Sequence, residues 1–253
     1  MEERATIRVG RFNQHFARRH ILAALAALLI SAAAGWSQAP LSKHSKLTGD
    51  LAEILSHMNK AAENLRTISA NLEYTKVTVL VDDKAVQSGQ LLYRRAKGKG
   101  TDILIDFKKP EPKTIAFSKD RGEIYNPKIN QIDEYNLEGK SGLIEQFLLL
   151  GFGTETEKIK RDYDLKFLKE EDLQGDITVV LELTPHSETA RAQLTKIQLW
   201  VSEESWLPAQ QKFFQPGGDY LMARYTNVKV NRPLSNAAFI IRAPNDVKRV
   251  GVN

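Results

Sequence analysis

Few side chains in this sequence have the types and spacing that carry out catalysis or hold metal ions. The chain contains no cysteine and five histidines. The three that follow residue 40, His44, His57 and His186, have neither one another nor a carboxylate at a metal-ligand spacing. No serine lies in a G-x-S-x-G motif. The sequence therefore predicts no metal site, no cofactor and no enzymatic activity, and we expect a binding function.

Two short motifs are typical of ligand sites but are better interpreted otherwise. Gly139-Lys140-Ser141 matches the end of a phosphate-binding loop, yet Glu134 stands where such a loop needs its first glycine. The acidic run at residues 169–172 has oxygens for a cation, but it is typical of a solvated loop. We expect neither motif to form a site.

The N-terminal residues have the anatomy of an export signal. Arg18 and Arg19 precede an apolar stretch of 14 residues, 21–34, whereas a membrane-spanning helix needs roughly 20. Small residues follow, so cleavage is expected near residues 35–39. We expect a periplasmic protein in which residues 1–39 are the signal, 40–48 a linker and 49–253 one domain. An uncleaved anchor and a twin-arginine export route remain alternatives.

Composition narrows the class of protein further. Without cysteine the chain has no disulfide and no residue for lipid attachment of the bacterial lipoprotein type. Without residues 1–39 it carries 31 basic and 29 acidic side chains, a net charge of +2. That balance gives no support to nucleic-acid binding.

Hydrophobic periodicity predicts one long helix followed by many strands. Apolar spacings of three and four predict an amphipathic helix over residues 51–68, begun by Asp50 with Glu53. From Leu72 the period is two, with a register slip before residues 77–81 that suggests a bulge, and a turn follows at 82–84. A short apolar helix is expected over 143–150. Further strands are expected around 91–93, 103–107, 115–117, 124–125, 129–135, 163–167, 177–183, 197–201, 209–214, 221–225 and 239–241.

Ten or eleven antiparallel strands with two or three helices are most economically arranged as one sheet. The predicted fold class is mainly β with α: a strongly curved antiparallel sheet, rolled into an incomplete β-barrel and closed by short helices.

Four segments, in this order, resemble those of one family. They are residues 89–95 (Gly-Gln-Leu-Leu-Tyr-Arg-Arg), residues 107–110 leading to 124–131, Leu183-Thr184-Pro185 before a strand with Trp200, and Phe239 followed by Pro244 and Val247. Together with the export signal, they resemble LolA, the periplasmic lipoprotein carrier, over about residues 50–250.

The resemblance implies a carrier that accepts acylated lipoproteins from an inner-membrane ABC transporter complex and delivers them to an outer-membrane receptor, and a monomer is expected. It implies that Arg95 latches a lid made by helices 51–68 and 143–150. Ala96 replaces the family's proline, so Arg94 is an alternative latch. The acyl-cavity side chains expected on the inward face are Ile68, Leu72, Tyr74, Ile103, Ile105, Phe107, Ile115 and Phe117.

Several alternatives stay open. The inward face is either a cavity wall or an ordinary packed core, and Arg95 is either a latch or a solvated side chain. Trp200 is either an exposed partner contact or the cover of a helix. Other functions within the same half-barrel group are a carrier of other lipids and an envelope-stress sensor module. A secreted lipid hydrolase is disfavoured because no nucleophile constellation is visible.

Overall fold

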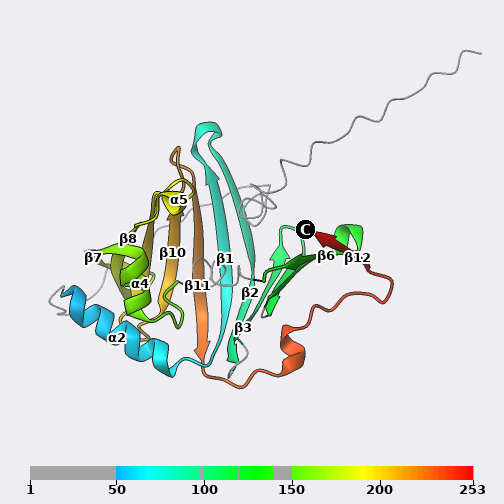
Figure 1. Ribbon diagram of the computed structural model, residues 1–253, viewed down its shortest axis with the longest axis horizontal. Coiled ribbons are helices and arrows are strands. Elements are labelled where there is room, and N and C mark those ends of the chain that lie inside the picture. Colours follow the sequence, from blue (N-terminus) through cyan, green and yellow to red (C-terminus); the bar gives the residue numbers. More distant parts are fainter. Residues whose placement is uncertain (1–49, 97–99, 119, 139–149, 253) are drawn as a thin grey trace, which may run out of the picture. The chain divides into compact units, whose positions relative to one another are not determined.

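The computed structural model describes residues 50–96, 100–118, 120–138 and 150–252 (Figure 1). The expected signal, the linker and residues 143–149 of the expected second helix lie outside these residues. None of the helices within the described part of the chain is long and apolar enough to cross a membrane.

Twelve strands form one sheet, and its two edge strands, β12 and β7, do not pair with each other among the described residues. The order across the sheet is β12-β6-β5-β4-β3-β2-β1-β11-β10-β9-β8-β7. All neighbours are antiparallel except β12, which pairs with β6 in parallel. The bounds are β1 (Thr67–Thr78), β2 (Asp83–Ala96), β3 (Gly100–Lys109), β4 (Lys113–Ser118), β5 (Arg121–Asn126), β6 (Gln131–Asn136), β7 (Tyr163–Leu173), β8 (Asp176–Pro185), β9 (Lys196–Ser202), β10 (Pro208–Phe214), β11 (Tyr220–Val230) and β12 (Lys248–Val252). The predicted fold class, a mainly β chain with an open, mostly antiparallel sheet and a few short helices, is confirmed.

The helices of the described residues are short. They are α2 (Leu51–Asn64), α4 (Thr156–Asp162) and α5 (Glu188–Arg191), with 3-10 turns η2 (Val79–Val81), η3 (Pro127–Ile129) and η4 (Asn236–Phe239). Asp50 caps α2 as predicted, because its carboxylate accepts a hydrogen bond from the amide of Ala52 (2.9 Å). The prediction that this helix runs to residue 68 is wrong. Ile68 lies in β1, where it pairs with Tyr93 of β2; its apolar side chain continued the helical spacing because a buried strand selects the same residue types.

Apolar side chains are buried on both faces of the sheet. One cluster joins α2 to β8 and β9 and includes Ile54, Leu55, Met58, Leu181, Leu183, Ile197 and Leu199. A second cluster, on the other face, joins β3 to β6 with the C-terminal segment and includes Leu104, Ala116, Tyr125, Ile132 and Ile241. In Figure 1, α2 and α4 accordingly lie beside the β7–β10 half, and the segment after β11 runs beside β3 and β6.

Two predicted strand segments differ from the structure. Residues 239–241 are not the last strand, because Phe239 ends η4 and the last strand is β12. Phe239 and Ile241 are apolar because they pack in the second cluster, which covers β3–β6. Residues Val79–Val81 are not strand either but a 3-10 turn at the tip of the β1–β2 hairpin. The irregularity of β1 falls between Ser69 and Asn71, earlier than the predicted slip.

Two predicted surface features are also corrected. Residues 169–172 belong to β7 and not to a loop. Trp200 is not an exposed contact: it is 8% exposed, and its indole Nε1 donates a hydrogen bond to Oε2 of Glu171 (2.7 Å). The acidic run is therefore an edge strand, and one of its carboxylates satisfies a buried indole.

Candidate functional site

The eight side chains predicted to contact acyl chains lie on one face of the sheet. Residues paired across neighbouring strands point to the same side, and Ile103 pairs with Phe117 while Ile105 pairs with Ile115. The register of β2 extends this face to β1. The full set is Ile68, Leu72, Tyr74, Ile103, Ile105, Phe107, Ile115 and Phe117, and all but Tyr74 are at most 9% exposed. We call this side of the sheet the inner face.

Gly89 lies in the middle of the inner face, opposite Phe107. A Cβ at this position would lie 2.1 Å from the carbonyl oxygen of Asp106, so the two strands approach each other only with glycine here. The Phe107 ring packs edge-on against Tyr74, with ring centroids 6.3 Å apart. Burial raises the pKa of the Tyr74 hydroxyl, which stays neutral. Close packing of β2 against β3 thus explains why glycine begins the segment of residues 89–95.

Residues 150–153, which we call the strap, cross the inner face. Gln211 of β10 donates from Nε2 to the carbonyl oxygen of Leu150 (2.6 Å), and its Oε1 accepts from the hydroxyl of Tyr225 of β11 (2.8 Å). Phe152 packs edge-on against the ring of Tyr225, with centroids 4.8 Å apart. Gln211 and Tyr225 are buried, and buried polar groups need partners. The strap and the two side chains therefore satisfy one another.

Two glycines allow the strap to lie close against the sheet. Gly151 and Gly153 have φ values of +84° and +71°, a region that other residues rarely adopt. A Cβ on Gly151 would lie 2.7 Å from Cγ of Pro208, and one on Gly153 would lie 2.6 Å from Nη2 of Arg95. The backbone conformation favours glycine at both positions, and a Cβ at either one would force Pro208 or the Arg95 guanidinium to shift.

Arg95, near the end of β2, connects the strap to helix α2. Its Nη2 donates to the carbonyl oxygen of Gly153 (2.5 Å), and its Nη1 donates to the carbonyl oxygen of Ala62 (3.2 Å). Ala62 is in the last turn of α2, where the helix dipole favours a cation. One guanidinium therefore binds two segments that lie over the inner face. Its role as a latch stays a prediction.

Arg94 points to the opposite face of the sheet. Its Nε and Nη2 donate to Oδ2 of Asp102 (3.1 and 2.6 Å), and its Nη1 donates to Oδ1 of Asn236 (2.8 Å). The guanidinium also lies 4.5 Å from the centroid of the Phe239 ring. Arg94 thus holds the C-terminal segment. The two arginines that the sequence left as alternatives contact different parts of the molecule.

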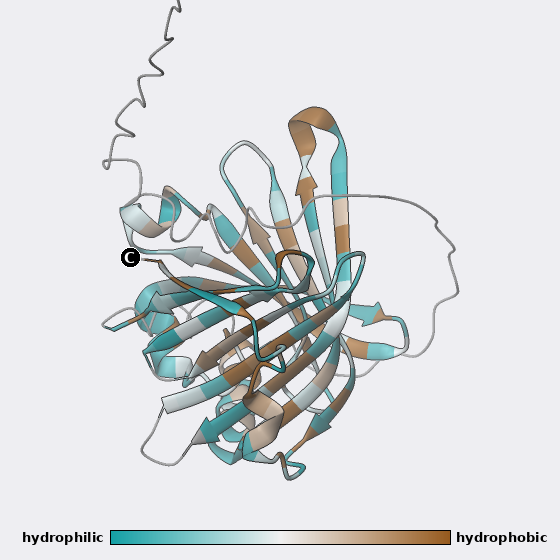
Figure 2. Cartoon of the chain, turned by 90° about the vertical axis from the view of Figure 1, so that its right-hand side faces the viewer, coloured by the Kyte–Doolittle hydropathy of each residue, from teal (hydrophilic) through white to brown (hydrophobic). Residues whose placement is uncertain are grey.

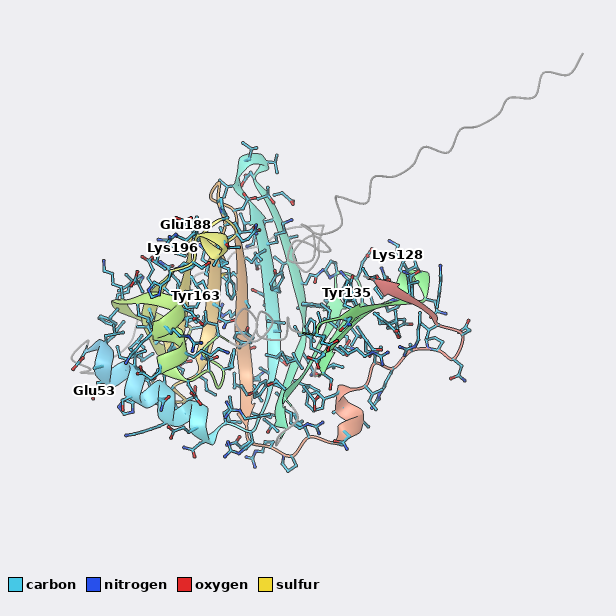
Figure 3. All side chains as sticks on the ribbon, in the orientation of Figure 1. Glu53, Lys128, Tyr135, Tyr163, Glu188 and Lys196 are labelled. Carbon is cyan, nitrogen blue, oxygen red and sulfur yellow. The ribbon has the colours of Figure 1, made fainter. Side chains whose placement is uncertain are left out.

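A pocket of about 260 Å³ lies beside the strap. Its lining includes Arg95, Phe152, Lys158, Asp162 and Tyr163, the last of which is labelled at the start of β7 in Figure 3. The lining mixes apolar, cationic and acidic groups. None of the eight acyl-contact candidates is among the lining residues, so a cavity at those side chains stays a prediction.

The strap was missed by reasoning from the sequence. The sequence predicts a helix over residues 143–150, and the Gly-Phe-Gly triplet that follows Leu150 is the available signal for a close backbone approach. Gln211 gave no signal, because a polar residue within a strand is expected on the solvated face. Within the described residues no three His, Asp or Glu side chains are grouped so as to hold a metal ion.

Comparisons with known proteins relate the chain to others mainly through its fold. A family model described as an uncharacterized protein matches residues 124–239, and no curated protein matches the sequence. The structure of MucB matches with a TM-score of 0.51 and 13% identity over 79% of this chain and 65% of that chain. An uncharacterized conserved protein from Thermus thermophilus matches with a TM-score of 0.52 and 14% identity over 79% and 98%. A LolA superfamily protein from Nitrosomonas europaea matches with a TM-score of 0.37 and 15% identity over 75% and 97%.

The chain spans only 60 to 65% of the length of three MucB chains to which it is similar. At 13 and 14% identity, the likeness to MucB and to the Thermus protein is one of fold alone. Membership of the LolA family itself stays a prediction. The open, mostly antiparallel sheet of this chain thus gives it a fold similar to that of solved proteins that include MucB.

Proposed function

We propose that the protein binds acyl chains on the inner face of its sheet and carries lipoproteins through the periplasm, from an inner-membrane ABC transporter complex to an outer-membrane receptor. One observation supports this most strongly: eight apolar side chains share the face that a hydrogen-bonded strap crosses. The sequence resemblance to LolA supports the same interpretation. In this proposal the inner face binds the cargo and the strap controls access to it.

A carrier must release what it binds. Burial of an acyl chain contributes about 0.8 kcal/mol per CH₂, so a permanently open apolar cavity would hold several chains almost irreversibly. The strap is held by a few hydrogen bonds from Arg95 and Gln211, each worth about 0.5–3 kcal/mol. Energies of that size allow two states whose populations a cargo can shift.

In this proposal the described state is the closed form of the carrier. All of the acyl-contact candidates except Tyr74 are at most 9% exposed, so these side chains are covered in the described state. Loading therefore requires the strap to move away from the inner face. Gly151 and Gly153 are the positions where its backbone can change direction at low cost.

A second candidate is a sensor module that binds a lipid or protein partner in the cell envelope. The fold likeness to MucB supports it, since MucB has been solved in complex with MucA. A carrier of lipids other than lipoproteins is a third form of the same binding function. Mass spectrometry of lipids and lipoproteins that co-purify with the exported protein distinguishes these candidates.

The test of acyl binding uses a matched pair of variants. Phe107→Glu places a charge on the inner face, and Ile129→Glu places the same charge at an exposed apolar position, 60% exposed in η3. We expect Phe107→Glu to lose uptake of a fluorescent fatty acyl probe while far-UV circular dichroism stays native, because a cavity wall can rehydrate. Ile129→Glu should bind the probe normally.

Unfolding of Phe107→Glu would contradict the acyl-binding proposal. A charge buried in dry packing without a partner costs several kcal/mol. If Phe107→Glu unfolds and never gives a folded form that fails to bind the probe, the inner face is a packed core. The acyl-binding proposal would then be wrong.

A further inference from the structure

The hairpin of β1 and β2 ends in three exposed apolar side chains, which we call the apolar tip. Val79, Leu80 and Val81 are 52%, 92% and 67% exposed. Figure 2 shows the tip as a hydrophobic end on a long hairpin, and in Figure 1 the same hairpin stands between β11 and β3. Leu80 is the most exposed of the large apolar residues in the described part of the chain.

The backbone of the apolar tip is fixed. Val79–Val81 form a single 3-10 turn that ends at Asp82 in the left-handed region (φ +49°), and the amide of Asp82 donates to the carbonyl oxygen of Val79 (3.2 Å). The amide of Val79 donates to Oδ1 of Asp219 in the neighbouring β10–β11 turn (2.8 Å). The three side chains are therefore presented in a defined arrangement.

The turn itself does not require apolar residues. The β5–β6 hairpin is closed by the same kind of turn, η3, which runs Pro127–Ile129 and ends at Asn130 with φ +46°. That turn includes a lysine, Lys128, and its cap Asn126 is polar. The geometry of the turn therefore does not by itself account for three consecutive exposed apolar residues at the β1–β2 turn.

We propose that the apolar tip inserts into the surface of a lipid bilayer. A 3-10 turn has three residues per turn, so three consecutive side chains point in three directions around its axis. A protein groove contacts one side of such a tip, whereas the boundary between lipid headgroups and acyl chains surrounds all of it. A convex tip with apolar side chains all round fits the second environment.

The residues just behind the tip suit a membrane interface. Tyr220 pairs with Val77 at the end of β1, and Phe214 pairs with Tyr220. The ammonium group of Lys212 lies 3.8 Å from the centroid of the Tyr220 ring and 4.7 Å from that of Phe214. Aromatic rings and lysines whose stems lie along apolar surface are typical of the headgroup level.

Charge near the tip is mixed, so an apolar contact has to supply the affinity. Lys76 and Lys84 flank the turn on the two strands, while Asp82, Asp83 and Asp219 lie at or beside it. Because the signs nearly balance, we expect binding to vesicles of neutral phosphatidylcholine and only a modest gain from anionic phosphatidylglycerol. This inference does not depend on the carrier proposal, since it concerns a different surface.

The experiment measures co-sedimentation of the exported protein with phosphatidylcholine vesicles and with vesicles of an equal mixture of phosphatidylcholine and phosphatidylglycerol. Leu80→Ser should weaken the partition coefficient by about tenfold or more, the fold-change expected for losing one buried leucine side chain. The triple variant V79S/L80S/V81S should abolish binding. Ile129→Ser is the matched control in η3 and should bind like the unchanged protein.

Thermal unfolding of each variant checks that the hairpin stays folded, which is expected because the replaced side chains are exposed. Two results would overturn the proposal. One is no binding of the unchanged protein to either vesicle, which would point to a protein partner for the apolar tip. The other is equal binding by the unchanged protein and the triple variant.

Discussion

Replacing Arg95 with leucine tests the connection between the strap and helix α2. The substitution keeps much of the side-chain bulk and removes the donors to the carbonyl oxygens of Gly153 and Ala62. Arg94→Leu is the matched control, because Arg94 lies one residue away on the same strand but binds Asp102 and Asn236 on the opposite face.

The magnitude follows from the two distances. The bond to Gly153 is short, at 2.5 Å, and the bond to Ala62 is long, at 3.2 Å, so the pair is counted as one hydrogen bond from a charged donor. Such a bond contributes about 1.5–3 kcal/mol. Its loss should shift the ratio of open to closed states by roughly tenfold to 150-fold.

Amide hydrogen exchange measures that shift directly. In Arg95→Leu, exchange in residues 150–153 should accelerate by about the same factor, while exchange in the C-terminal segment stays unchanged. Arg94→Leu should do the reverse and accelerate exchange in residues 236–252. In a transfer assay, Arg95→Leu should load an acylated cargo but release it slowly, because the empty closed state no longer competes with the loaded one.

Two outcomes would refute this reasoning. If Arg95→Leu leaves strap exchange unchanged while Arg94→Leu accelerates it, the arginine has been assigned to the wrong segment. If strap exchange rises as expected but cargo release keeps its normal rate in both variants, Arg95 fastens the strap without controlling release.

Three further substitutions test neighbouring features. Gly153→Ala places a Cβ against the Arg95 guanidinium in a backbone conformation that alanine disfavours, so we expect a loss of about 1–3 kcal/mol in urea denaturation. Gln211→Leu removes the buried donor to the strap and should cost about 1–3 kcal/mol of unfolding free energy. An unchanged midpoint of urea denaturation would show that the hydrogen bond from Gln211 to Leu150 does not stabilise the fold. His186 contacts the Asp164 carboxylate (3.0 Å), which raises the pKa of its imidazole above the ordinary 6.5. Its stabilising contribution is therefore complete below pH 6.5 and is lost as pH rises through the raised pKa, so His186→Gln should flatten that part of the curve of unfolding free energy against pH.

Alternation along single strands was enough to predict most of the sheet. In β8, Val179, Leu181 and Leu183 are fully buried as predicted, but Thr178 and Val180 on the other face are buried as well, so burial alternates only beyond Leu181. The start of α2 followed from Asp50 because capping is local. The C-terminal strand β12 was not predictable in this way, because Arg249 holds it against Glu123 of β5 and Glu134 of β6, residues far away in the sequence.

In the candidate site, too, local features could be predicted from the sequence and long-range contacts could not. The shared face of Ile103, Ile105 and Phe107 follows from their spacing within β3. The partners of Arg95 do not follow from spacing, since a guanidinium that binds backbone carbonyls leaves no pattern in the side chains of its partners. Only the tertiary arrangement places the strap beside it.

The pairing of β1 with β11 has a consequence for how the chain folds. Strands β1–β6 and β7–β11 are each a run of hairpins that can form from local contacts, whereas Leu72 must find Tyr225 to join the two runs into one sheet. Such a long-range pairing carries the largest loop-closure entropy and is expected to form late. The strap is fastened by Gln211 on one side of this seam and by Arg95 on the other. The strap therefore bridges the pairing that is expected to form late, so we expect the β1–β11 pairing to lose this support whenever the strap opens.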